Sequence, residues 1–205
     1  MEPESESLSF LLTELPLLLA TFPSSETILG LLSIVLLLVF SGLISGSEVA
    51  FFSLTANDLN NLKNENGKSS QLILNLSKKP RQLLATILIS NNFVNIAIVI
   101  ISEIVIRQLF PETFFNGLAE QIASWITAER SVIVNIARFL ITVIGVTFLL
   151  VLFGEVAPKM YANLNNIRLI KIMARPLGIL MQLFTPFNKV LVGFSDVIEN
   201  RLNPV

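Results

Sequence analysis

Residues 28–54 read ILGLLSIVLLLVFSGLISGSEVAFFSL, and this stretch decides the fold. Its first half is almost wholly apolar, and the whole is long enough to cross a bilayer core of about 30 Å as a helix. In the second half Ser41, Ser45 and Glu48 stand at i, i+4 and i+7, so their side chains share one helix face. Polar side chains at membrane depth cost free energy and indicate a functional site. The stretch therefore predicts a membrane-spanning helix that carries part of a cation site.

Two glycines, Gly42 and Gly46, lie in the same segment. Glycine weakens a helix, but it also lets another backbone approach closely. We therefore expect a second helix to pack tightly against this one beside the serines.

The composition is that of a membrane protein. Of the 205 residues 53% are hydrophobic and 14% are charged, whereas a soluble domain carries roughly 25% charged residues. Cysteine and histidine are absent, which excludes disulfide scaffolds, thiolate or imidazole metal sites and Ser–His or Cys–His catalysis. We expect no enzyme, and any metal site must use oxygen ligands, which suit Mg²⁺, Ca²⁺ or Na⁺. No basic cluster is interleaved with aromatic residues, so nucleic-acid binding has no support.

Hydropathy and charge together predict an all-α membrane protein with three spans, at about residues 28–52, 83–106 and 132–153. Basic residues alternate along the chain. The acidic segment 1–27 has none, residues 53–82 carry five, few follow the second span, and four lie just after the third. Because cytoplasmic loops carry the excess of Lys and Arg, this pattern places the N-terminus outside and the C-terminus in the cytoplasm.

The remaining segments are expected to form a belt of juxtamembrane helices. We divide the chain into an extracytoplasmic N-terminal segment (1–27), a transmembrane domain (28–166), and an amphipathic juxtamembrane helix with the chain end (167–205). Two prolines and scattered basic residues interrupt this last segment, which favours a bent helix lying on the membrane surface. A fourth crossing is the alternative. Residues 56–76 are also predicted to lie at the interface, broken near Gly67.

The second span contains three asparagines. Asn91 and Asn95 are four residues apart and share one helix face, while Asn92 points about 100° away. Amide oxygens coordinate hard cations, but amides also join helices through hydrogen bonds. Both interpretations stay open for this pair.

The third span ends at Gly154, Glu155 and Pro158. Proline has no N–H, so the carbonyl four residues earlier, that of Gly154, is expected to lose its helical partner. A freed carbonyl beside a carboxylate is how a broken transmembrane helix presents ligands to a cation. The alternative is a simple helix stop with Glu155 in interfacial water.

The polar groups of the three spans are predicted to lie at similar depths in the membrane. At about 1.5 Å per residue, Ser45 lies roughly 10 Å and Asn91 roughly 12 Å from the inner ends of their spans, and Gly154 lies at the inner end of the third. We therefore predict one inward-facing cavity. Glu103 and Arg138 lie toward the outer ends of their spans, which favours a structural ion pair between them. The alternative is that each side chain extends separately toward the membrane surface.

The segments SGLISGSEVAFFSL, ILISNNFVNI and LLVLFGEVAPKMYANLN resemble the three signature segments of the DUF21 transmembrane domain of CNNM/CorC magnesium transporters. The N-terminal acidic segment also resembles the gliding-motility-associated branch found in Bacteroidetes. The resemblance implies a homodimer in the bacterial inner membrane, a dehydrated Mg²⁺ in an inward-facing cavity, and export coupled to Na⁺. It implies six metal ligands, carried over motif by motif: Ser41, Ser45, Asn91, Asn95, Gly154 and Glu155.

Two departures from this family pattern stand out. Ser90 replaces the glycine that usually precedes the first asparagine, which would either narrow the cavity or add a ligand. Relatives normally continue into a nucleotide-binding pair of CBS modules, which this chain lacks, so it resembles an isolated or truncated membrane domain. The alternative function is that of a non-transporting membrane partner or assembly factor of a gliding-motility or secretion apparatus.

Overall fold

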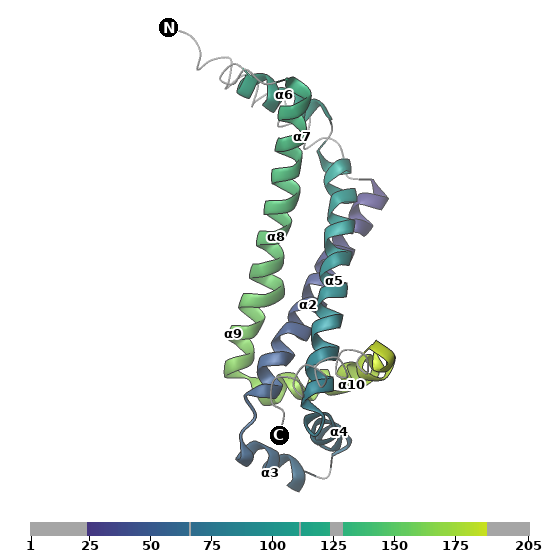
Figure 1. Cartoon of the computed structure of the whole chain (residues 1–205), viewed down its shortest axis with the longest axis vertical. Coiled ribbons are helices and arrows are strands. Elements are labelled where there is room, and N and C mark those ends of the chain that lie inside the picture. The colour runs from purple at the N-terminus through teal and green to yellow at the C-terminus, as the bar shows by residue number, and fades with distance from the viewer. Residues whose placement is uncertain (1–23, 66, 111, 124–128, 188–205) are drawn as a thin grey trace, which may run out of the picture.

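The computed structural model describes residues 24–65, 67–110, 112–123 and 129–187. Within these residues every regular element is a helix, as predicted. Three long helices run side by side and shorter helices gather at both ends (Figure 1). The predicted segment 1–27, up to residue 23, and the chain end from residue 188 lie outside the described residues.

The first two spans are single α-helices. Helix α2 covers Ser25–Phe52 and α5 covers Pro80–Leu109, and each is long and apolar enough to cross a membrane. The second helix is three residues longer at each end than the predicted 83–106, because Pro80 starts the helix from its first position. Both spans are therefore present, and each extends somewhat beyond the apolar segment that predicted it.

The third span is one continuous helix, Ser131–Leu164, whose hydrogen-bond register changes along its length. It is built from α7 (Arg130–Leu140), the π-helical η1 (Ile141–Gly145), α8 (Val146–Leu149), the π-helical η2 (Leu150–Val156) and α9 (Ala157–Leu164).

The third helix does not stop where the sequence predicted. We expected an end near residue 153 and a break at Pro158, but the helix passes through Pro158 to Leu164. In an α-helix a proline ring clashes with the carbonyl four residues earlier. Here the N–H of Ala157 donates to the carbonyl of Leu152, five residues back. The wider π turn relieves the clash, so the proline is accommodated inside the helix.

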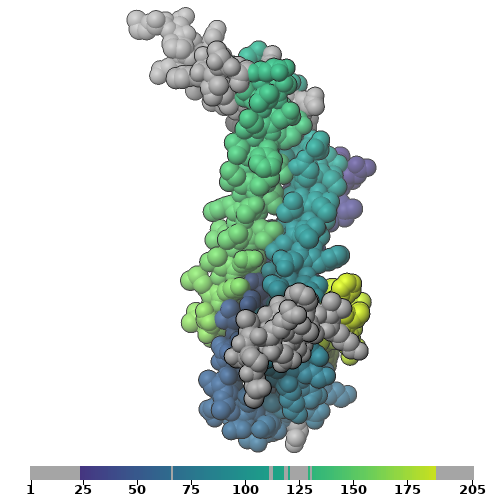
Figure 2. Space-filling model, in the orientation of Figure 1, coloured from purple at the N-terminus to yellow at the C-terminus, as the bar shows by residue number. Residues whose placement is uncertain are grey.

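The outward faces of the spans are apolar. Leu36, Phe93 and Phe148 are each more than 60% exposed in the isolated chain, a pattern expected of side chains that face lipid tails. Figure 2 shows these helices as a long column with α3 and α4 at its lower end. Most of the exposed large apolar side chains therefore lie on the spans, and Ile172, Ile179 and Leu183 of α10 add to them.

Helix α2 is the centre of the packing, with contacts to α5, η2, α9 and α10. The close approach to the third span is made possible by the two glycines. A Cβ on Gly42 would lie 2.7 Å from Cγ of Pro158, and one on Gly46 would lie 3.1 Å from the carbonyl oxygen of Pro158. Both distances are shorter than or at the limit of normal contact, so the predicted tight approach at these glycines is confirmed.

Three helices gather at one end of the spans, the lower end in Figure 1. They are α3 (Ala56–Asn64), α4 (Lys68–Ser77) and α10 (Asn166–Leu183), and α10 runs across the spans with Pro176 inside it. We call this the basic end, because it carries nine of the fourteen Lys and Arg residues: Lys63, Lys68, Lys78, Lys79, Arg81, Lys159, Arg168, Lys171 and Arg175. The structure separates α3 from α4 at Gly67, where the break was predicted.

Local contacts fix the helices of the basic end. Thr55 and Asp58 form a capping box at the start of α3, and the hydrogen bond from the Thr55 side chain, followed by the one from its backbone, lowers the pKa of Asp58. Glu65, after α3, accepts a hydrogen bond from Ser70 of α4 (2.8 Å) and pairs with Lys171 of α10 (2.8 Å). These contacts join the three helices to one another.

The opposite end of the spans carries a different set of contacts. Thr27 of α2 donates to Gln108 of α5 (2.8 Å). Glu103 pairs with Arg107, one turn along its own helix (2.8 Å), and not with Arg138 as predicted. The guanidinium of Arg138 instead lies 5.0 Å from the ring centre of Phe115 in α6 (Glu112–Ala123). A partner four residues away on the same helix is always within reach, and this explains why Glu103 pairs with Arg107 and not with Arg138.

Candidate cation site

The site is built around Ser41, in the middle of α2. Its side chain is fully buried, and its Oγ lies 3.1 Å from Oδ1 of Asn91 and 2.8 Å from Oδ1 of Asn95 on α5. The predicted shared face of Asn91 and Asn95 therefore turns toward the serine stripe of α2. We call these three residues the Ser41 cluster.

The Ser41 cluster has more acceptors than hydrogens. A serine hydroxyl carries a single hydrogen, and two amide oxygens converge on it. Only one of them receives a full hydrogen bond at a time, so the other amide oxygen keeps free lone pairs at this partly buried place. Such an arrangement suits a positively charged ligand.

The third span approaches the same point through Gly154, in η2. A Cβ on Gly154 would lie 3.1 Å from Oγ of Ser41, so any larger residue would press on the cluster. Gly154 is buried and lies directly beside the hydroxyl. Four of the six predicted ligands, Ser41, Asn91, Asn95 and Gly154, therefore lie together at Ser41.

The π turn also brings the carbonyl of Phe153 opposite the proline. Because Ala157 already pairs with Leu152, the next carbonyl, that of Phe153, is opposite the nitrogen of Pro158, which has no hydrogen. The carbonyl of Gly154, which the usual four-residue spacing singles out, stays a prediction. The Phe153 oxygen faces α2, 3.0 Å from where a Cβ of Gly42 would stand.

A small cavity lies on the side of the cluster toward the basic end. Its volume is about 30 Å³ and its polar lining comes from Ser45, Glu48 and Asn91. We call it the inner hollow. A cavity of this size holds a water molecule or a small ion. Because Asn91 belongs to both the Ser41 cluster and the inner hollow, the two form one continuous polar path.

The Ser45 hydroxyl is the unsatisfied polar group of this path. Its hydroxyl is buried, with 2% of the side chain exposed, and has no hydrogen-bond partner in the described part of the chain. A buried hydroxyl without a partner costs about 1–3 kcal/mol, so a ligand or a water in the inner hollow would satisfy it. The Oγ of Ser90 is likewise buried and unsatisfied. Ser47 differs, because it donates to the carbonyl of Leu43 on its own helix.

Glu48 closes the inner hollow toward the basic end. Its Oε2 lies 3.3 Å from Nζ of Lys159 on α9, and each side chain is 39% exposed. The sequence placed Glu48 on the same helix face as Ser41 and Ser45, but it did not connect Glu48 with Lys159. The only feature of the sequence that could have indicated this contact was the position of Lys159 directly after Pro158.

Glu155 is not joined to the other five predicted ligands. Among the described residues its carboxylate makes no hydrogen bond or ion pair. In the same part of the chain no group of three or more Asp, Glu, His or Cys side chains comes together. The candidate site is thus made of neutral oxygens, with carboxylates only at its edge.

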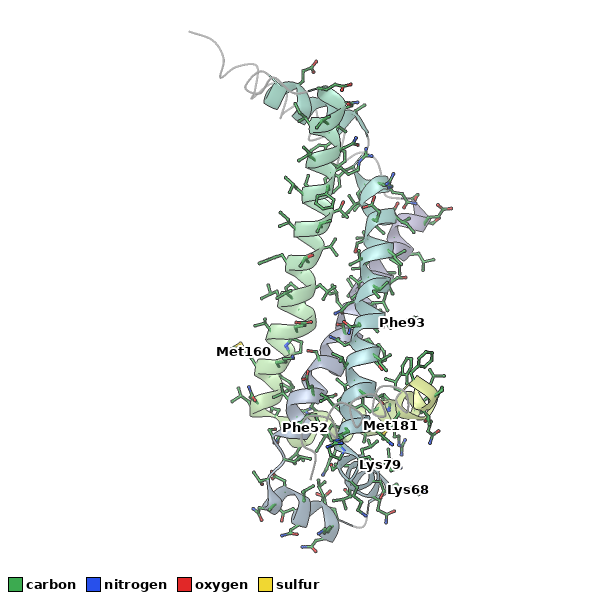
Figure 3. All side chains as sticks on the ribbon, in the orientation of Figure 1. Phe52, Lys68, Lys79, Phe93, Met160 and Met181 are labelled. Carbon is green, nitrogen blue, oxygen red and sulfur yellow. The ribbon has the colours of Figure 1, made fainter. Side chains whose placement is uncertain are left out.

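The position of the site along the spans can be followed in Figure 3. Phe93, two residues after Asn91, lies partway along α5, well above Phe52 at the end of α2.

Three helices of this length and hydropathy, with a buried polar cluster between them, define an integral membrane protein. Residues 32–204 match the model of the Cyclin M transmembrane N-terminal domain. The chain belongs to this family, CNNM, as the three motifs predicted.

A relative from Haemophilus influenzae (strain ATCC 51907 / DSM 11121 / KW20 / Rd), described as a UPF0053 protein, is 28% identical over 169 residues. The alignment covers 82% of this chain and 34% of that protein. The chain therefore spans about a third of the length of this relative.

Proposed function

We propose that the chain is the membrane domain of a Mg²⁺ transporter and that the Ser41 cluster binds the transported ion. The observation that carries the proposal is the convergence of three side-chain oxygens from two spans on one buried point. Membership in CNNM supports a metal-transport role. The ion is the cargo of the protein, so binding must be strong enough for loading and weak enough for release.

The spacing of these oxygens suits Mg²⁺. Adjacent ligands of an octahedral Mg²⁺ with bonds of 2.0–2.1 Å are about 2.9 Å apart. The distances from Oγ of Ser41 to the two amide oxygens are 3.1 and 2.8 Å. These two hydrogen-bond distances are close to the edge length of the coordination octahedron. An ion could therefore bridge the Ser41 oxygen and an amide oxygen with little movement, once the hydroxyl hydrogen turns away from the amide oxygens.

The small cavity supports loading from the basic end. The inner hollow leads from Glu48 past Ser45 to Asn91, and Asn91 is already part of the Ser41 cluster. The carboxylate of Glu48 lies at the edge of the inner hollow, where it attracts cations. The neutral oxygens of Ser45 and Asn91 lie deeper. If the basic end is cytoplasmic, as the positive-inside rule predicts, the site is loaded from the cytoplasm.

The remaining parts of the proposal come from the family. They are export of a dehydrated Mg²⁺ in exchange for Na⁺, assembly as a homodimer, and residence in the bacterial inner membrane. Of the six proposed ligands, Ser41, Asn91 and Asn95 provide side-chain oxygens, Ser45 lies one turn away, and the η2 turn with Gly154 and Glu155 provides backbone oxygens and a nearby charge.

The test is Mg²⁺ binding by isothermal titration of the purified chain. Asn91→Ala should weaken binding at least tenfold. Asn92→Ala is the matched control, because it removes the same amide from the neighbouring, exposed position and should leave binding unchanged. Equal affinity in the two variants would overturn the assignment of the site.

Transport is tested separately in liposomes that contain a Mg²⁺-sensitive dye. We expect flux in the wild type and its loss in Asn91→Ala. A folded, Mg²⁺-binding protein without flux would contradict transport by this chain and favour the role of a membrane partner in a larger apparatus.

A further inference from the structure

The ion pair between Glu48 and Lys159 lies beside the inner hollow, and Glu48, whose side chain is 39% exposed, is the charged residue that lines it. Glu48 lines the hollow, and its Oε2 lies 3.3 Å from the ammonium of Lys159. The carboxylate that a cation would meet first is therefore already in contact with a cation that belongs to the protein.

We propose that Lys159 is a tethered competitor that an entering Mg²⁺ must displace from Glu48, so that this residue sets which cations load the site. The inference rests on the proposed function, since it concerns access to the same path.

The geometry makes Lys159 displaceable. Both side chains are 39% exposed, and an ion pair this open to water contributes only about 0–1 kcal/mol. The released ammonium can return to solvent at the basic end. Lys159 therefore competes for the carboxylate without blocking it permanently.

The charge of the competitor favours divalent ions. At equal distance Glu48 attracts a dication twice as strongly as an ammonium group, because Coulomb energy is proportional to charge. A monovalent ion has no such advantage over Lys159, which is also held nearby by its own helix. The pair should thus admit Mg²⁺ in preference to Na⁺ or K⁺.

The chain contains a matched control pair. Lys171 and Glu65 form an ion pair of 2.8 Å at the same end of the molecule, with side chains 38% and 50% exposed. Glu65 does not line the inner hollow. Removing Lys171 therefore changes the net charge as much as removing Lys159 does, but it does not free a carboxylate of the path.

The experiment measures Mg²⁺ affinity by isothermal titration at constant ionic strength, using the full chain. Lys159→Met should bind Mg²⁺ about two- to fivefold more tightly than the wild type, as expected when an exposed competing pair is removed. Lys171→Met should bind like the wild type. In Lys159→Met, replacing choline by Na⁺ should weaken Mg²⁺ binding more than it does in the wild type.

A second measurement follows Lys159 itself. Saturating Mg²⁺ should increase the rate of reductive methylation of Lys159, read by mass spectrometry, and leave that of Lys171 unchanged. Equal affinities in Lys159→Met and Lys171→Met, or a labelling rate of Lys159 that ignores Mg²⁺, would overturn the inference. A wild type that does not bind Mg²⁺ at all would instead reject the proposed function, so the two failures are distinguishable.

Discussion

The hydroxyl of Ser41 lies 2.8 Å from the amide oxygen of Asn95 across the interface of the first two spans. It is the shortest polar link between α2 and α5 near the middle of the molecule, and the serine that makes it is fully buried. One hydroxyl thus serves both the packing of two helices and the proposed binding of an ion, and substitutions can separate these two roles.

Replacing Ser41 by alanine should affect both roles. We expect a loss of about 1–3 kcal/mol in stability, because buried amide oxygens lose their donor. The increase in melting temperature that Mg²⁺ causes in the wild type should also disappear. Ser47→Ala is the control, since the Ser47 hydroxyl only returns to the carbonyl of Leu43 on its own helix. Melting curves with and without Mg²⁺ compare the two, and an identical response to Mg²⁺ would contradict the role of Ser41.

Gly42→Ala should loosen the packing of α2 on the third span. The added methyl group would lie 2.7 Å from Cγ of Pro158 and 3.0 Å from the Phe153 carbonyl oxygen. Overpacking of this kind costs about 1–3 kcal/mol, measurable as a lower melting temperature. Gly145→Ala provides the comparison, because its Cβ would meet nothing within 4 Å. The prediction fails if both variants melt alike.

Pro158→Ala tests the π turn. The new N–H can pair with a preceding carbonyl, so the variant should be at least as stable as the wild type, yet Mg²⁺ binding should weaken because the turn beside Ser41 can return to an α register. Pro176→Ala changes a proline inside α10, away from the Ser41 cluster, and we expect unchanged Mg²⁺ affinity. Titration of both variants checks this, and undiminished affinity in Pro158→Ala would argue against a role for the turn.

The link between α10 and Glu65 should depend on pH. The hydrogen bond from Lys171, assisted by the one from Ser70, holds the pKa of Glu65 below its ordinary value of 4.5. A carboxyl whose pKa is lowered in the folded state contributes stability above its unfolded pKa and loses it as the pH falls through the folded value. Below pH 4.5, thermal stability should therefore decrease more steeply in the wild type than in Glu65→Gln. Parallel curves would exclude a stabilising role for this contact.

The predicted orientation can be read by cysteine labelling, because the chain has no cysteine of its own. Ser24→Cys lies before α2 and Gly67→Cys lies between α3 and α4, and both positions are exposed. A membrane-impermeant maleimide added to intact cells should label Ser24→Cys and should reach Gly67→Cys only after permeabilisation. The reverse pattern would invert the proposed direction of loading.

Much of this protein follows from the sequence alone. Apolar segments of sufficient length predicted the three spans, and the motifs around Ser41, Asn91 and Gly154 predicted the family and the helices that meet. Helical spacing also predicted that Asn91 and Asn95 share a face, because side-chain direction repeats with the pitch of a helix. These properties are local, so they are visible in the order of residues.

The tertiary structure decided what depends on contacts between helices. The π register of η2 places the carbonyl of Phe153 opposite Pro158, and Arg107 lies beside Glu103 where Arg138 was predicted. The contact of Lys159 with Glu48 joins residues more than one hundred positions apart. The hydrogen-bond register of η2 depends on how the third span packs against the glycines of α2, and the choice of an ion-pair partner depends on which of several charged side chains lies nearest in space. Hydropathy and helical spacing along the chain determine neither.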